Sequence, residues 1–229
     1  MADVSLRRSS DVVAPCTIAN CNNARGTRRV DSDVVTSARH RLQRADRDLA
    51  ALAVLALLTQ GPRHPYDLHR FMIDTRKDFV TGLPRSIYHA VDKLARDGLI
   101  AVHGSEQQAG RPERTTYELT DAGRAELRRR VSLLLATPES DATLSYAALS
   151  FMGALTRDDA LVALRARIAA LDVQRATLAA DLAEASGVPP ILLVESRLEQ
   201  ARLDAERSWF AGLVDDLESG ELAWLDTRA

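Results

Sequence analysis

Cysteine is scarce in this chain, and its placement limits the class of protein. Only Cys16 and Cys21 occur among 229 residues, both in the first polar stretch. This excludes a disulfide framework and fits a reducing intracellular compartment. No nearby histidine or second cysteine pair completes a tetrahedral site, so we expect no metal and no cofactor.

Long hydrophobic runs are also absent. The longest wholly apolar run, residues 49–58, is too short to cross a bilayer. The N-terminus has no unbroken hydrophobic core of a signal peptide. We therefore expect a cytoplasmic protein without a membrane partner.

The signatures of common enzyme sites are missing as well. Gly104 and Gly110 are too far apart to cradle a phosphate and follow no βα unit. His64 and His69 are five residues apart, off a common helical face. Adjacent aspartate pairs point in different directions on a helix, and no nucleophile–base–orienter set stands out. The sequence therefore predicts no catalytic residues and no enzyme.

What is present is a division of charge along the chain. Residues 1–45 carry 8 Lys/Arg against 4 Asp/Glu, residues 46–136 carry 14 against 12, and residues 137–229 carry 8 against 16. The front of the chain is basic and the back is acidic. A polyanionic partner is expected at the front.

Residues 1–45 have no sustained apolar period and are rich in polar residues. We expect a disordered basic extension. Arg25, Arg28 and Arg29 there are either part of a solvated tail or light contacts to a phosphate backbone.

An amphipathic segment between Pro84 and Gly98 is the most informative stretch. Proline suits the first helical position, and glycine suits the end of a helix. At helical spacing, one face is apolar and the other is mainly cationic. The apolar face comprises Ile87, Ala90, Val91 and Leu94; the polar face comprises Arg85, His89, Asp92, Lys93 and Arg96. We predict a DNA recognition helix.

The flanking segments fit a winged helix-turn-helix domain at residues 46–136. A helix that is apolar nearly all round starts near residue 49, and a second spans about 66–75. Strands at about 99–103 and 115–119 are joined by the polar loop 104–114, which predicts a hairpin wing. A helix over 121–136, capped by Thr120, completes the domain.

Contacts with DNA follow from the expected docking of such a helix. Arg85, Ser86 and His89 lie near its N-terminal end and are candidates for base readout. Lys93 and Arg96 lie further along and are candidates for phosphate contacts.

Four further residues have more than one interpretation. Tyr88 is either core alone or core with its hydroxyl at a phosphate. Asp92 either accepts from a cytosine amino group or orients a cation. In the wing, Arg111 and Arg114 are candidates for DNA contact, Arg111 in the minor groove; the alternative is a solvated hairpin tip.

Residues 138–229 are expected to form a helical dimerisation and effector domain with two long helices. Leu161, Leu164, Ile168, Leu171, Leu178 and Leu182 form a heptad seam that Arg175 interrupts. The last helix carries the stripe Val194, Leu198, Ala201, Ala205, Trp209, Leu213 and Leu217. Little else in the chain could cover it, so we expect a homodimer. The predicted fold class is mainly α, a winged helix-turn-helix with a small two-stranded wing plus this all-α C-terminal domain.

Aromatic residues make up only 4% of the chain, which draws attention to Trp209 and Phe210. A flat aromatic effector could stack on Trp209 near the junction of the two domains. The alternative is that Trp209 packs in the dimer seam.

Residues 49–127 resemble the PadR family of bacterial transcriptional regulators. The matching motifs are Gly-Pro-x-x-x-Tyr-x-Leu before the second helix, Pro-x-x-x-Tyr and Asp-Gly-Leu-Ile around the third, and Gly-Arg-Pro leading to Tyr-x-Leu-Thr-x-x-Gly around the wing. The C-terminal half is similar to the longer subgroup of that family, through Trp209 and the helix pattern. Leu83 and Arg85 depart from the family pattern at the tip expected to face DNA.

The resemblance implies a homodimer that binds an inverted-repeat operator on double-stranded DNA. Such proteins are usually repressors, and some are released by a small aromatic or lipophilic effector. The competing hypothesis is a winged helix that binds protein instead of DNA and serves as an interaction scaffold.

Overall fold

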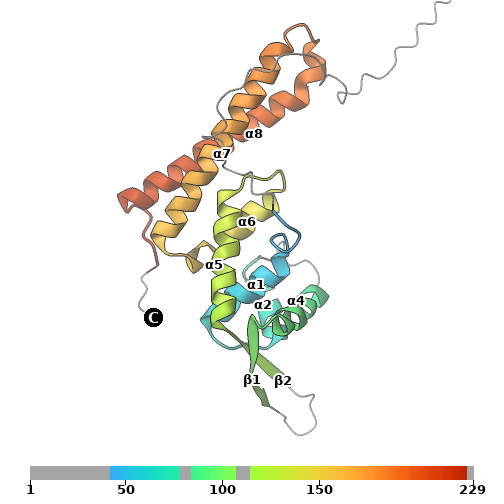
Figure 1. The fold of residues 1–229 in the computed structure, drawn as a ribbon, viewed down its shortest axis with the longest axis vertical. Helices are drawn as coiled ribbons and strands as arrows, with labels where there is room; N and C mark the ends of the chain where they lie inside the picture. Colours follow the sequence, from blue (N-terminus) through green and yellow to red (C-terminus); the bar gives the residue numbers. More distant parts are fainter. Residues whose placement is uncertain (1–41, 78–83, 107–113, 226–229) are drawn as a thin grey trace, which may run out of the picture. The chain divides into compact units, whose positions relative to one another are not determined.

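The computed structural model describes residues 42–77, 84–106 and 114–225 (Figure 1). The predictions for the basic extension and for Arg111 fall outside these ranges. Within them, the chain is mainly helical, with one two-stranded antiparallel sheet.

Helix α1 (Leu49–Leu57) is buried on all sides, as its composition predicts. All residues from Ala51 to Leu57 are buried. Asp48 starts the helix by accepting a hydrogen bond from the Ala51 N–H at 3.1 Å. The chain leaves α1 through the 3₁₀ turn η2 (Leu58–Gln60).

Helix α2 (Pro65–Asp74) has proline at its first position, where a missing N–H has no cost. His64 precedes it, and its Nδ1 atom accepts a hydrogen bond from the Tyr66 N–H at 3.1 Å. Leu68 and Met72 anchor α2 in the core.

Helix α4 (Pro84–Arg96) ends where the sequence predicts. Gly98 has a φ of 70°, the left-handed conformation that glycine adopts most readily. The Leu99 N–H donates to the Leu94 carbonyl and the Gly98 N–H donates to the Ala95 carbonyl, which satisfies two terminal acceptors. α4 packs against α1, α2 and the first strand.

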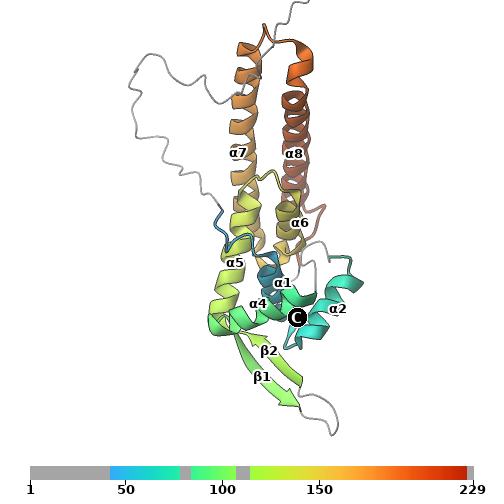
Figure 2. The ribbon, with the colours of Figure 1, turned by 90° about the vertical axis from the view of Figure 1, so that its right-hand side faces the viewer.

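The wing consists of β1 (Ile100–Glu106) and β2 (Arg114–Leu119), and both views show it projecting from the helices (Figures 1 and 2). β1 is longer than predicted. The prediction that residues 104–106 belong to a loop is wrong, because Gly104, Ser105 and Glu106 pair with residues 116 to 114. Cross-strand hydrogen bonding outweighs their low strand propensity, and a register shift after Val102 accommodates the irregularity.

Helix α5 (Asp121–Ala136) follows the wing and packs against α1. Thr120 caps it, as predicted, through a 3.1 Å hydrogen bond from the Gly123 N–H. Gly123 is buried against the Leu99 carbonyl, so the first turn of α5 lies directly on the exit from α4.

The segment after α5 contains a short helix and a 3₁₀ turn in place of one continuous helix. The structure has α6 (Ala142–Ser150) and then a separate 3₁₀ turn, η3 (Met152–Ala154). Gly153 lies in that turn, and glycine costs a helix interior about 1 kcal/mol relative to alanine.

Two long helices, α7 (Arg157–Glu184) and α8 (Val194–Ser219), lie side by side and antiparallel (Figure 2). A 3₁₀ turn, η4 (Pro190–Leu193), precedes α8. Thr156 caps α7 through the Asp159 N–H, at 3.1 Å. At the predicted break in the seam, Arg175 of α7 donates to Asp204 of α8 at 2.6 Å.

Candidate nucleic-acid interface

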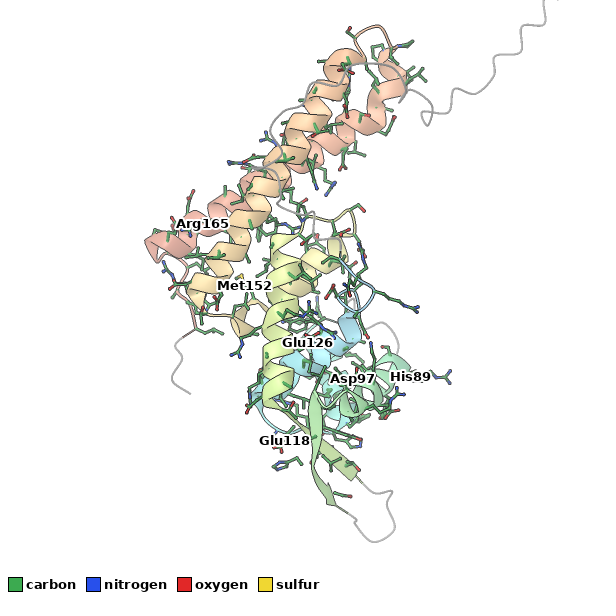
Figure 3. The ribbon with its side chains drawn as sticks, in the orientation of Figure 1. His89, Asp97, Glu118, Glu126, Met152 and Arg165 are labelled. Atoms are coloured by element: carbon green, nitrogen blue, oxygen red, sulfur yellow. The ribbon has the colours of Figure 1, made fainter. Side chains whose placement is uncertain are left out.

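Helix α4 has two chemically distinct faces. Ile87, Val91 and Leu94 are at most 1% exposed, and Ala90 is also buried. Burial of this stripe fixes the rotation of the helix about its axis. The opposite face therefore points to solvent, and Figure 3 shows His89 directed away from the rest of the domain.

The predicted base-reading residues lie on that outer face or at its edge. Arg85 and His89 are exposed, and Ser86 is half-buried. Tyr88 is 44% exposed, so its ring is not part of the core, contrary to both interpretations of this residue. Its ring continues the outer face of α4.

Two further residues of this face are connected to each other. Arg96 is exposed, and its Nε donates to the backbone carbonyl of Asp92 at 3.2 Å. The Asp92 carboxylate is on the exposed side of the helix beside these cations. The other guanidinium nitrogens of Arg96 have no hydrogen bond to the described residues and are available to an acceptor such as phosphate.

Lys93 contacts an acid of the same domain. Its Nζ lies 3.1 Å from Asp48 Oδ2, with side-chain exposures of 42% and 28%. Asp48 uses its other oxygen to cap α1, so this pair ties α4 to the start of α1. An ion pair this exposed contributes at most about 1 kcal/mol, and phosphate can compete for the lysine.

Arg114, the first residue of β2 and next to the loop that joins the two strands, contacts α2. One of its terminal nitrogens lies 2.7 Å from both carboxylate oxygens of Asp67. Beside it, Arg63 and Tyr117 exchange two backbone hydrogen bonds of 3.0 Å, which adds a third segment to the sheet. These contacts hold the wing against the start of α2.

His64 lies in the same region and is held neutral. Burial, and then the neighbouring Arg114 guanidinium, lower the pKa of His64 below its ordinary value, although Asp67 acts in the opposite direction. A neutral ring is needed for Nδ1 to accept the Tyr66 N–H. His64 lines an open hollow of about 660 Å³ with Arg63, His103 and Arg114.

Two arginines of α5 form ion pairs with acids of the same chain. Glu126, labelled in Figure 3, accepts from Arg129 at 2.8 Å and from Arg130 at 2.6 Å, and Arg129 also reaches Asp46. The hydrogen bond from Arg129, with that from Arg130, lowers the pKa of Glu126 to about 2. The charge of these arginines is therefore balanced within the chain, in contrast to Arg85 of α4, which has no ion pair with a described residue.

Sequence reasoning missed the acids that engage the predicted DNA-contacting cations. Asp48 and Asp67 stand 45 and 47 residues from their partners. Their positions at the first turns of α1 and α2 indicate capping and helix-dipole roles, which gave no signal for the second contact.

The two predicted effector residues differ strongly in exposure. Trp209 is 55% exposed, whereas Phe210 is 3% exposed. Their rings meet edge to face, with centroids 5.0 Å apart and an interplanar angle of 89°. The structure thus places Trp209 at the surface and Phe210 inside, against the guanidinium of Arg167 at 4.5 Å.

Across residues 42–77, 84–106 and 114–225, no three or more His, Cys, Asp or Glu side chains cluster as a metal would require. Within the same ranges, no helix combines the length and apolarity needed to span a membrane.

Comparison with models of known protein families finds a match in the central part of the chain. Residues 54–129 match the transcriptional regulator PadR-like family, a segment that runs from α1 into α5. A search of curated proteins finds no significant match.

Several solved structures align with much of the chain at low similarity. Bacillus subtilis PadR in complex with operator DNA is 20% identical, with coverage of 73% of this chain and 98% of that one and a TM-score of 0.35. The same protein in complex with p-coumaric acid is 18% identical (75% and 97% covered, TM-score 0.32). A PadR-like transcriptional regulator from Bacillus cereus is 20% identical (74% and 98% covered, TM-score 0.32).

Proposed function

Since residues 54–129 belong to the PadR-like family of transcriptional regulators, we propose that this chain is a homodimeric repressor that binds an inverted-repeat operator. The family consists of regulators of transcription and not of enzymes. Each protomer inserts α4 into a major groove, and the dimer acts in the cytoplasm, where bacterial DNA lies.

The observation that carries this proposal is the two-sided character of α4. Its apolar stripe is buried to within 4% exposure, which leaves a rigid helix with Arg85, His89 and Arg96 directed outward. A helix anchored in this way can enter the major groove, which is wide enough to admit it.

We assign the contacts by position along the helix. Arg85 and His89 read base edges, with Ser86 and Tyr88 beside them. Lys93 and Arg96 hold phosphates, Lys93 after exchanging Asp48 for a phosphate oxygen. Arg114 contacts the DNA backbone with the guanidinium nitrogens that do not contact Asp67. Arg111, which lies outside the described residues, is assigned to the minor groove.

The exposed stripe of α8 supports the homodimer. Val194, Leu198 and Trp209 are 52%, 72% and 55% exposed, and they recur on one side of the helix. The opposite side packs against α7 through residues such as Leu203 and Phe210. An apolar stripe of this length is covered most simply by the same stripe of a second copy.

The proposal is tested by measuring the affinity of the full chain for duplex DNA as a function of salt. Phosphate contacts predict a linear and steep fall of log K with log salt concentration. Sequence-selective binding with this slope supports the proposal. An absence of DNA binding at low salt contradicts it and favours the protein-interaction scaffold.

A small aromatic effector is a finer part of the proposal and is supported by the exposed ring of Trp209. We test it with p-coumaric acid, the molecule bound to Bacillus subtilis PadR in one of the aligned structures. Quenching of tryptophan fluorescence in the wild type, lost in Trp209→Ala, supports an effector site. Equal signals in both proteins assign Trp209 to the dimer seam instead.

A further inference from the structure

Arg167 of α7 is the most deeply buried charged residue among those the structure describes. Its exposure is 0%, and each nitrogen of its guanidinium group donates hydrogen bonds within the chain. Nε and Nη2 donate to Glu206 Oε1 of α8 at 3.1 and 2.6 Å, and Nη2 also donates to Ser145 Oγ of α6 at 2.5 Å. The flat face of the group lies 4.5 Å from the centre of the Phe210 ring.

The remaining nitrogen points at the end of α5. Nη1 donates to the carbonyls of Leu134, Leu135 and Thr137 at 3.2, 3.3 and 2.9 Å. The last carbonyls of a helix have no partner within the helix and carry partial negative charge. Arg167 therefore terminates α5 from another helix.

This arrangement is unusual for a residue that only stabilises a fold. Burying a charged pair is expensive, and apolar residues of similar size often stabilise a protein equally well. An arginine adds a geometric constraint, because its donors are fixed in one plane and meet their acceptors in only one orientation. Arg167 thus fixes the angle at which α7 and α8 meet the end of α5.

That angle affects how α4 is placed relative to the proposed contact between protomers. α5 packs against α1 and follows the wing, so it moves with α4. α7 and α8 form the helical pair whose outer stripe is the proposed contact between protomers. The junction at Arg167 therefore lies between the DNA-reading helix and the symmetry axis.

We infer that Arg167 is a positioning residue that sets the spacing between the two operator half-sites which the dimer accepts. This inference rests on the proposed function. One base pair of spacing corresponds to about 3.4 Å along the duplex and about a tenth of a turn around it. A small change of angle at the base of α5 is enough to move α4 by that amount.

The test uses Arg167→Lys in the full chain. Lysine keeps the positive charge beside Glu206, but a single ammonium group cannot reach three carbonyls and Ser145 together or stack flat on Phe210. A pool of random duplexes is incubated with each protein, and the bound sequences are identified. We expect one spacing between inverted repeats for the wild type, and several spacings around the same half-site sequence for Arg167→Lys.

Arg165→Lys is the matched control. Arg165 also lies on α7 and pairs with a glutamate of α8, Glu218, but no hydrogen bond or ion pair joins it to the described residues of α5. We expect this variant to retain the wild-type spacing. If Arg167→Lys fails to fold by circular dichroism, Glu206→Gln, which keeps the side-chain shape and removes one charge of the pair, takes its place.

The outcomes separate the two hypotheses. A single unchanged spacing in a folded Arg167 or Glu206 variant overturns the inference and leaves the proposed function intact. Several spacings already in the wild type also overturn it. If the wild type selects no sequence at all, the proposed function fails, and the inference fails with it.

Discussion

At the scale of single residues, the cations on the outer face of α4 differ in whether they form an ion pair within the protein. Arg85 has no ion pair among the residues that the structure describes, whereas Lys93 contacts Asp48 at 3.1 Å. Base readout and phosphate contact are therefore separable by substitution.

Arg85→Ala is expected to relax operator discrimination, because a bidentate arginine contact to guanine contributes about 1–3 kcal/mol against the wrong base. Binding of operator and base-substituted duplexes, measured at one salt concentration, checks this. Unchanged discrimination would remove Arg85 from the interface.

Lys93→Met provides the contrast. We expect it to weaken all duplexes to a similar degree and to reduce the salt slope by about one contact. Thermal stability should change little, because the exposed pair with Asp48 contributes at most about 1 kcal/mol. A loss confined to one sequence would instead assign Lys93 to base readout.

His64 gives the domain a dependence on pH. The pKa of this ring is lowered in the folded state, mainly by burial and then by Arg114. The stabilisation from its cap on α2 is therefore complete above the ordinary histidine pKa of about 6.5 and is lost as pH falls through the lower folded value.

We expect the free energy of unfolding to decrease over that acid range in the wild type and to decrease less in His64→Asn. Asparagine is a good cap that does not titrate in this range. Chemical denaturation at a series of pH values is the measurement, with His69→Gln on the same helix as control. An identical pH dependence in wild type and His64→Asn would contradict the assignment.

At the scale of elements, the closest approach to any described glycine is between the first turn of α5 and the exit of α4. A Cβ atom at Gly123 would lie 2.0 Å from the Leu99 carbonyl oxygen and 2.7 Å from Leu119 Cδ1. Neither the backbone of residue 99 nor the start of α5 can move without disturbing the wing.

Gly123→Ala should therefore destabilise the protein by about 1–3 kcal/mol or more, as overpacking does in a close-packed core. Gly187→Ala, in the turn after α7, is the matched control, because nothing lies within 4 Å of its added methyl group. There the protein should gain about 0.4–1 kcal/mol. Denaturant titration of both variants checks the opposite signs.

Much of this architecture could be predicted because its signals are local. The apolar and polar faces of α4, the caps Thr120 and Thr156, and the terminating Gly98 each follow from spacing of a few residues. The extent of β1 could not, since Gly104–Glu106 become strand only by pairing with β2. The contacts of Arg167 join residues 22 to 39 positions apart, and no local pattern specifies them.

At the scale of the whole molecule, α8 has two apolar sides that differ in solvent exposure. One side, with Leu203, Phe210 and Val214, is buried by α7 within the chain. The other, with Leu198 and Trp209, remains exposed. The pair of α7 and α8 therefore buries one apolar side of α8 within the chain and leaves the other apolar side exposed to solvent.

Leu198→Glu tests whether a second copy covers the exposed side. Because Leu198 is 72% exposed, a charge there should leave the folding of a single chain intact. In a dimer interface, two buried carboxylates would face each other across the symmetry axis and dissociate the protomers.

Sedimentation velocity should show the variant at half the mass of the wild type, with unchanged helical content. Gln200→Glu, which adds the same charge on a different side of α8, should stay dimeric. A monomeric wild type, or a dimeric Leu198→Glu, would mean that the recognition helices are not paired through α8, and the inverted-repeat operator would then need another explanation.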